Sequence, residues 1–196
     1  MYAAVIIAGP DEPGVFQAGQ LLALAGQAEG RYVTWLPATD LEARAGLAHG
    51  TVIISQAPIL SPAVGQPTAA LVASTPALEH YALRVRAGGV LVVDSAVVEK
   101  LAGRSDIREI DLPATTIATD LGMPEAGIIA LLGALIRATG VVRQDTIEQV
   151  LAAQLADQPR PVLAAYRQAL RQGADLVAVL VFGYAPVDAW MGPVTV

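Results

Sequence analysis

A carboxylate and a guanidinium two residues apart, Glu42 and Arg44, are the side chains in this sequence that could most readily bind a ligand or a partner. They lie in a loop between two β-branched and aromatic runs, 32–36 and 51–55, that indicate strands. Gly46 has no side chain, so a ligand or another backbone could approach the loop closely there. A long loop between buried strands is also more often functional than not. We therefore expect Glu42, Arg44 and Gly46 to bind a ligand or a partner. The alternative is an exposed ion pair worth less than about 1 kcal/mol.

The sequence contains none of the common motifs for nucleotide binding, hydrolysis or metal binding. The nucleotide fingerprints G-x-G-x-x-G and G-x-x-x-x-G-K-[ST] and the hydrolase pattern G-x-S-x-G do not occur. The two histidines, His49 and His80, are far apart and show no metal-binding spacing, and the sequence contains no cysteine. Iron–sulfur clusters need thiolate ligands, so this chain alone cannot hold one. We expect no catalytic residue and no metal ligand in this chain.

The turn after the first predicted strand, 3–8, carries two glycines that could approach a ligand or partner closely, Gly9 and Gly14. Two prolines in this turn remove backbone N–H donors, and Asp11 and Glu12 place negative charge at the positive end of the following helix. A phosphate would be repelled there. Asp11 and Glu12 can also be explained as simple complements to the helix dipole.

Alternating strands and helices predict a three-layer α/β/α sandwich around a mainly parallel sheet. The predicted strands are 3–8, 32–36, 51–55, 69–73, 90–93 and, as a half-exposed edge strand, 107–112. The predicted helices are 15–28, 75–85, 114–121, 127–139, 145–155 and 162–172. Residues 57–67, with three prolines, should be irregular. We expect one domain over 1–173, ended by Gly173, and an apolar C-terminal extension over 174–196.

Ligands of open parallel sheets bind outside the carboxyl ends of the strands. In this sequence we expect these ends to bring together the 9–14 turn, the 37–50 loop, Ser55 and the pairs 74–75 and 94–95. Ser55 is for this reason a further candidate for ligand or partner binding.

The composition favours a protein with a buried partner surface. Hydrophobic residues make up 54% of the chain and charged residues only 15%, against roughly 25% in an ordinary soluble domain. The run 176–182 is apolar and rich in strand-forming residues. We expect it to extend the sheet or to cover a partner, so that the protein is not a monomer. Alternatively, it fills a groove in its own domain.

The charge excludes some partners. The net charge is −6, the pI is about 4.8 and the cations are scattered, which argues against nucleic acid. No signal-peptide pattern occurs at the start of the chain. The apolar run 126–136 is shorter than the roughly 20 residues that span a bilayer, so it indicates a buried helix. We expect a cytoplasmic protein that does not bind membranes.

The pattern T-W-L-P-x-x-x-x-E-x-R-x-G-x-x-x-x-T-V-I-I-S, over 34–55, resembles the gamma subunit or gamma domain of 2-oxoacid:acceptor oxidoreductases such as pyruvate:ferredoxin oxidoreductase. The resemblance extends from Ala3 to about Gly173. Family members usually have S-Y-G-P-E-x-R-G-G in this loop, so Glu42, Arg44 and Gly46 match while the Tyr, the Pro and two Gly do not. The first turn, usually G-F-G-G-Q-G, and a helical Asn, here Gly127, also differ.

The resemblance implies a complex that converts a 2-oxoacid such as pyruvate to its acyl-CoA by oxidative decarboxylation. Its partners would be alpha- and beta-type subunits, and the complex would contain thiamine diphosphate, iron–sulfur clusters and coenzyme A. This chain would bind none of these alone and would shape the active site without being active by itself. The alternative is a diverged α/β binding or assembly protein, possibly a homo-oligomer, that kept the fold and lost the complex.

Overall fold

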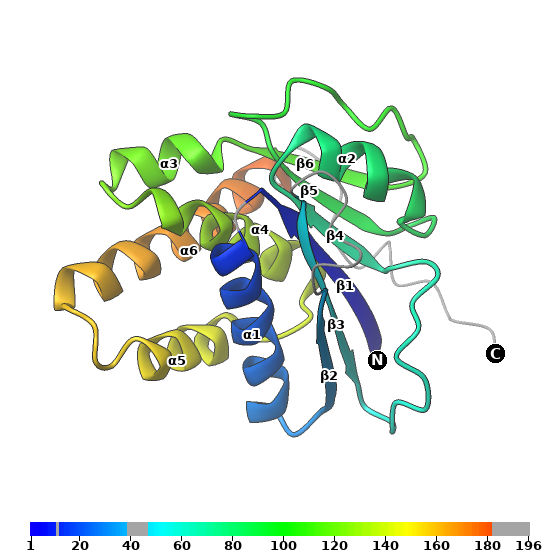
Figure 1. Cartoon of the computed structure of the whole chain (residues 1–196), viewed down its shortest axis with the longest axis horizontal. Helices are drawn as coiled ribbons and strands as arrows, with labels where there is room; N and C mark the ends of the chain where they lie inside the picture. The colour runs from blue at the N-terminus through cyan, green and yellow to red at the C-terminus, as the bar shows by residue number, and fades with distance from the viewer. Residues whose placement is uncertain (11, 39–46, 182–196) are drawn as a thin grey trace.

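The computed structural model describes residues 1–10, 12–38 and 47–181, which form a six-stranded mixed sheet in the order β2-β3-β1-β4-β5-β6 (Figure 1). The strands are β1 (Tyr2–Gly9), β2 (Tyr32–Pro37), β3 (Ala48–Ser55), β4 (Ala69–Val72), β5 (Val90–Asp94) and β6 (Arg108–Leu112). β1, β4, β5 and β6 pair in parallel, whereas β3 is antiparallel to both β1 and β2. The predicted strands are all present, and the sheet is mainly parallel as expected, apart from the reversed direction of β3.

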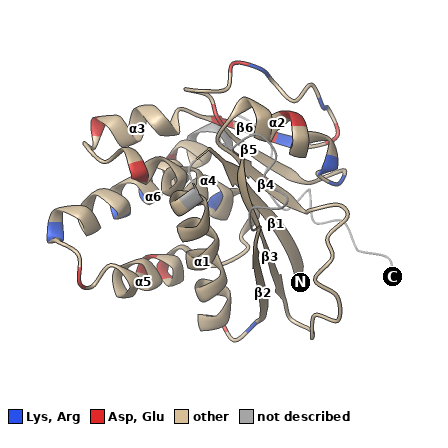
Figure 2. Ribbon diagram, viewed as in Figure 1, with Lys and Arg blue, Asp and Glu red and all other residues tan. Residues whose placement is uncertain are grey.

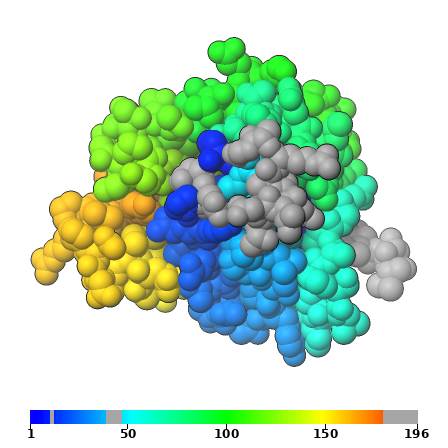
Figure 3. All heavy atoms as spheres, viewed as in Figure 1, coloured from blue at the N-terminus to red at the C-terminus, as the bar shows by residue number. Residues whose placement is uncertain are grey.

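Helices cover both faces of the sheet, which gives the expected α/β/α layering. The helices are α1 (Glu12–Ala28), α2 (Thr75–Tyr81), α3 (Ala114–Asp120), α4 (Gly127–Thr139), α5 (Gln144–Gln154) and α6 (Arg160–Val181), with 3₁₀ turns η2 (Ala82–Arg84) and η3 (Pro124–Ala126). α1 and α4 pack on one face of the sheet and α2 on the other. α6 lies against the outer side of α4. The elements α5 and α6 mark one end of the molecule, and the irregular chain from 56 to 67 marks the other (Figures 1 and 3).

The central strand β1 contributes to both halves of the core. Val5 and Ile7 pack with α1 and α4, whereas Ile6 and Ala8 pack with α2. Because successive side chains of a strand point to opposite faces, a strand covered on both sides must be apolar at every position. This explains the uninterrupted apolar run that predicted the strand.

The last helix is longer than the sequence predicted. Gly173 was expected to end it, but α6 continues to Val181 and includes most of the apolar run 176–182. This run was expected to extend the sheet or to cover a partner; as part of a helix it does not extend the sheet, and its role in covering a partner stays a prediction. A Cβ atom at Gly173 would overlap the carbonyl oxygen of Ala130 in α4. Gly173 therefore allows two helices to approach each other closely instead of ending one of them. Residues 182–196 lie outside the described residues, so the separate role of the C-terminal extension stays a prediction.

Two helix starts differ from those that the sequence predicts, which are a cap at Thr75 before Pro76 and a capping box formed by Asp145 and Glu148. Ser74, not Thr75, caps α2, since its hydroxyl oxygen accepts a hydrogen bond from the N–H of Ala77 at 3.3 Å. Asp145 and Glu148 do not form the predicted capping box, because the N-cap of α5 is the preceding Arg143. In the part of the chain that the structure describes, no helix has the length and hydropathy to cross a membrane.

Candidate functional site

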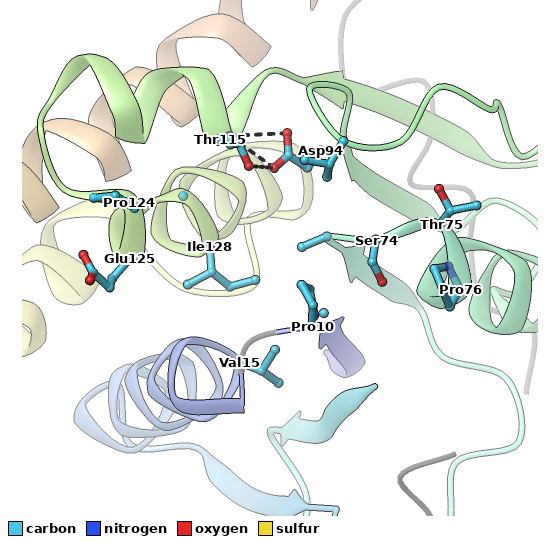
Figure 4. A pocket seen from close by; sticks show the side chains of 14 residues that line it. Pro10, Val15, Ser74, Thr75, Pro76, Asp94, Thr115, Pro124, Glu125 and Ile128 are labelled. Atoms are coloured by element: carbon cyan, nitrogen blue, oxygen red, sulfur yellow. Dashed lines mark hydrogen bonds between the residues drawn. The ribbon is translucent and has the colours of Figure 1, made fainter. Parts of the chain in front are cut away.

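A pocket of about 300 Å³ lies where β1 and β4 run side by side and end. The chain leaves β1 into α1 on one face of the sheet and leaves β4 into α2 on the other. Such a change of face between neighbouring parallel strands opens a crevice in which α/β proteins bind their ligands. Figure 4 shows the pocket between Pro10 and Val15, the start of α2, Asp94 and Thr115, and the residues that begin α4.

Asp94 and Thr115 form one wall of this pocket (Figure 4). Asp94 ends β5 and is 3% exposed. Its carboxylate accepts hydrogen bonds from the hydroxyl of Thr115 at 2.6 Å and from the backbone N–H groups of Ala96, Ala114 and Thr115 at 3.0–3.3 Å. Charge-assisted bonds of this kind are the strong ones in proteins. The carboxylate thereby attaches the start of α3 to the end of β5.

Small and hydroxyl-bearing residues also line the pocket. Gly9 lies so near Ala73 that a Cβ atom added to the glycine would be 3.2 Å from the Ala73 Cβ. Ser74 and Thr75 follow at the start of α2 and also line the pocket. A neutral group that accepts or donates hydrogen bonds would fit beside these hydroxyls.

The charged residues that line the pocket are both acidic. They are Asp94 and Glu125, and the described lining contains no lysine, arginine or histidine. These two carboxylates do not suit a phosphate or diphosphate. Groups of three or more His, Cys, Asp or Glu side chains that could hold a metal do not occur in the described residues. The residues therefore do not fit thiamine diphosphate or an iron–sulfur cluster, and no chemical step through either is assigned to this pocket.

Of the glycines predicted for the first turn, Gly9 lines the pocket. Gly14 is buried in the first turn of α1 and is not among the lining residues. The predicted Glu42, Arg44 and Gly46 lie outside the described residues, so their role in binding stays a prediction.

Ser55 is not at this edge of the sheet, contrary to the expectation. Because β3 runs antiparallel to β1, its carboxyl end lies beside the amino end of β1, where Ser55 pairs with Tyr2 and with Tyr32 of β2. The Ser55 hydroxyl oxygen is buried and accepts a hydrogen bond from the N–H of Ala57 at 3.1 Å. It stabilises the turn that follows β3.

Among the pocket residues that sequence reasoning missed are Thr115, Glu125 and Ile128. They come from α3, η3 and α4, which follow β6 at the far edge of the sheet. A signal was present, since the strand 107–112 is followed directly by a helix and its carboxyl end points to the same edge as those of β4 and β5. Because of this shared edge, the turn after the strand 107–112 should have been included among the candidate binding segments.

Comparison with known proteins connects this architecture to one family. A family model described as pyruvate ferredoxin/flavodoxin oxidoreductase matches residues 4–176. The chain is 36% identical over 141 residues to ketoisovalerate oxidoreductase subunit VorA of Methanothermobacter marburgensis, which covers 72% of this chain and 29% of that protein. It is 32% identical over 152 residues to 2-oxoglutarate synthase subunit KorC of the same organism, which covers 74% of this chain and 82% of that one.

A solved structure has the same fold over nearly its whole length. The gamma subunit of a keto/oxoacid ferredoxin oxidoreductase from Geobacter sulfurreducens superposes with a TM-score of 0.76 at 27% identity, covering 90% of this chain and 99% of the other. The chain spans less than a third of the length of VorA. The family match begins within β1, includes all the other strands and ends five residues before the end of α6. The resemblance seen in the sequence is confirmed, and the chain belongs to the pyruvate ferredoxin/flavodoxin oxidoreductase family.

Proposed function

We propose that this chain is the gamma-type subunit of a 2-oxoacid:ferredoxin oxidoreductase and that it shapes the active site and the access of coenzyme A to it. The observation that carries the proposal is the family match over residues 4–176. The similar proteins of known name are subunits of ketoisovalerate oxidoreductase and 2-oxoglutarate synthase. The substrate class is accordingly a 2-oxoacid, and the product is the acyl-CoA.

The residues of the pocket support a role without covalent chemistry. A nucleophile needs a neighbouring base, and a general acid or base needs a free proton-accepting atom near the substrate. Both oxygens of Asp94 already accept hydrogen bonds, the second carboxylate of the lining, Glu125, is exposed, and the described lining contains no histidine, lysine or cysteine. Thiamine diphosphate supplies carbanion chemistry and iron–sulfur clusters carry electrons when bound. We assign both groups to the alpha- and beta-type subunits.

The first turn favours one alternative. Its prolines and acidic residues replace the usual glycines, which is the pattern expected of a diverged binding or assembly protein that forms a homo-oligomer and kept the fold after losing the complex. In that case, the chain would assemble with itself and not with thiamine-diphosphate-binding subunits.

Coexpression distinguishes the two functions. The chain is produced together with alpha- and beta-type subunits from the same organism, with an affinity tag on the thiamine-diphosphate-binding subunit. We expect the untagged chain to be retained in a fixed stoichiometry and to coelute in size-exclusion chromatography. Elution of the chain only with copies of itself would support the alternative and overturn the proposed function.

A further inference from the structure

The described sheet ends in two edge strands that differ in charge. One edge is β6, which carries Arg108, Glu109 and Asp111 among its five residues. The Glu109 carboxylate also accepts hydrogen bonds from the N–H of Ala102, at 2.9 and 3.2 Å, which attaches the preceding chain to this strand. Charged side chains and neighbouring loops are the usual means by which proteins keep the edges of their sheets from pairing with further strands.

The opposite edge, β2, has no charged side chain. Residues 32–39 contain no Asp, Glu, Lys or Arg, and Figure 2 draws β2 without charged positions. The charges that precede it, Glu29 and Arg31, form an ion pair of 2.8 Å, and Arg31 also donates to the carbonyl of Val141. These two groups are bound within the protein itself. An uncharged edge strand of this kind is a template on which another strand can pair.

Trp35 fixes β2 in its extended conformation. A Cβ atom at Gly19 of α1 or at Gly50 of β3 would overlap the Trp35 ring, which shows that the ring lies tightly against both elements. Phe16 meets the same ring edge-on, with 6.2 Å between the ring centroids, and Val33 packs into the same core. An edge that is already held in strand geometry loses little conformational entropy when it pairs.

The register between β2 and β3 determines which backbone groups of β2 point outward. Ala38 N–H donates to the carbonyl of His49 at 3.0 Å, and these two residues continue the register of the strand pair. In an antiparallel pair, every second residue is hydrogen-bonded to the neighbouring strand. Residues 32, 34 and 36 therefore bond to β3, and residues 33, 35 and 37 direct their backbone groups away from the sheet.

Only two of the outward residues offer both a donor and an acceptor. They are Val33 and Trp35, and within the described residues no other element bonds to their outward N–H and C=O groups. Pro37, the next outward residue, has no N–H. On the other side, the N–H of Arg31 already donates to the carbonyl of Gly26 at 3.1 Å. The outward hydrogen-bonding stretch of β2 is therefore short and bounded at both ends.

A second copy of β2 satisfies this stretch in one antiparallel register, with Thr34 opposite Thr34 of the second copy. Val33 then pairs with Trp35 of the second copy and Trp35 with its Val33, which gives four N–H···O=C hydrogen bonds and requires no N–H from Pro37. A register centred on Trp35 would place Val33 opposite Pro37, and the Val33 carbonyl would lack a donor.

The same register pairs the exposed side chains of β2. Tyr32 is 51% exposed and Leu36 is 40% exposed, and both lie on the face of β2 that points away from α1. Tyr32 of each copy would lie opposite Leu36 of the other, so both side chains would lose apolar area to water. The two Thr34 side chains would meet on the axis, and paired threonines are favourable cross-strand neighbours.

We propose that the β2 strands of two copies of this chain pair antiparallel about a two-fold axis at Thr34, which joins the two six-stranded sheets into one. The backbone groups alone would accept other strands, whereas the match of Tyr32 with Leu36 and of Thr34 with itself selects a second copy. The contact is the same on both copies and closes at a dimer. No residue of β2 lines the pocket, so the pairing goes beyond the proposed function and does not depend on it.

Sedimentation of the full chain tests the pairing through charges at position 34. We expect the wild type to sediment at micromolar concentration with twice the 20.2 kDa mass of one chain. Thr34→Lys and Thr34→Glu should each raise the dissociation constant of the dimer at least about tenfold, because like charges meet on the axis. A mixture of the two variants should restore the dimer. Thr116→Lys, at an exposed position of α3, is the matched control and should behave as the wild type.

Single cysteines test the register, because the chain contains no cysteine of its own. Thr34→Cys should form a disulfide-linked dimer under mild oxidation, since facing residues of an antiparallel pair bring their Cβ atoms close enough for this bond. A mixture of Tyr32→Cys and Leu36→Cys should also crosslink, whereas neither variant should crosslink alone. Thr116→Cys is the control for random collision and should remain a single chain.

The remaining outcomes overturn the inference. A wild type that sediments as a single chain, or a Thr34→Lys variant that dimerises as the wild type does, would show that β2 is not the contact. Failure of the Lys and Glu variants to form a mixed dimer would show that their loss of pairing came from misfolding or from another surface. Equal crosslinking of Thr34→Cys and Thr116→Cys would do the same. All of these measurements use this chain alone, so their failure leaves the proposed function untouched.

Discussion

The hydroxyl of Thr115 donates a 2.6 Å hydrogen bond to the buried carboxylate of Asp94, which joins the end of β5 to the first turn of α3. This contact links two segments that are 21 residues apart in the sequence. It fixes one wall of the pocket, because the remaining acceptor positions of Asp94 are occupied by backbone N–H groups of the same two segments.

Asp94→Asn should therefore destabilise the protein. An amide has one acceptor oxygen in place of two and would turn an NH₂ group toward N–H donors. We expect a loss on the order of 2 kcal/mol in the free energy of unfolding, measured by urea denaturation, because hydrogen bonds to charged groups have this magnitude. Asp120→Asn, at the exposed end of α3, is the control and should change stability by less than about 0.5 kcal/mol. Equal stability of the two variants would contradict the role of Asp94.

Much of the fold follows from local patterns in the sequence. The uninterrupted apolar runs identified β1 and β5, and the strict alternation over 107–112 identified the edge strand β6. The direction of β3 did not follow, because an apolar run of this kind is compatible with either direction. Parallel neighbouring strands need a crossover connection, which is usually a helix. A helix pattern between β2 and β3 would therefore have indicated that these two strands run parallel.

The site was predictable only in part for a similar reason. The ends of β1, β4 and β5 could be placed at one edge, which found Gly9 and drew attention to the neighbourhoods of Ser74 and Asp94. Ser55 was placed wrongly because its position depends on the direction of β3. The partnership of Asp94 with Thr115 is a tertiary contact that no local pattern encodes.

Gly133→Ala should destabilise the packing of α4 against α6. A Cβ atom at Gly133 would overlap the carbonyl oxygen of Leu170, and a helix backbone cannot move aside as a side chain can. We expect a loss of about 2 kcal/mol despite the better helix propensity of alanine. Gly65→Ala is the matched control, because no atom lies within 4 Å of its Cβ position. Thermal unfolding of both variants is the measurement, and a neutral Gly133→Ala would show that the helices can separate without cost.

The ion pair between Glu148 and Arg171 should make stability depend on pH. Arg171 donates two hydrogen bonds to Glu148, of 3.0 and 2.5 Å, and these bonds lower the pKa of the carboxyl in the folded protein. A lowered pKa stabilises the folded state above the pKa of the unfolded chain, and this stabilisation is lost as the pH falls through the folded value. The melting temperature of the wild type should exceed that of Glu148→Gln near neutral pH, and the difference should shrink as the solution is acidified.

A double variant provides the control for this pH dependence. In the Arg171→Gln background, the effect of Glu148→Gln on the melting temperature should depend less on pH, because only the weaker influences of Gln144 and Arg167 then lower the pKa of the Glu148 carboxyl. A difference between wild type and Glu148→Gln that persists unchanged in acid would show that the ion pair does not shift the pKa.

The isolated chain should bind neither NAD nor ATP. The first turn lacks the glycine fingerprint, and the charged residues that line the pocket, Asp94 and Glu125, would repel a diphosphate. Isothermal titration calorimetry with each nucleotide, and with a nucleotide-binding dehydrogenase as positive control, should give no binding heat for this chain. Micromolar affinity for either nucleotide would show that the pocket accepts phosphate groups.

The central claim, that this chain is a gamma-type subunit, is tested most directly by measuring whether the alpha- and beta-type subunits need the chain for activity. The alpha- and beta-type subunits are purified without the chain, and the reduction of a viologen dye is measured with a 2-oxoacid and coenzyme A as the chain is added. The account predicts that activity rises with added chain, saturates at the stoichiometry of the purified complex, and is zero for the chain alone. Full activity of the other subunits without the chain, or no response to its addition, would contradict its assignment as a gamma-type subunit.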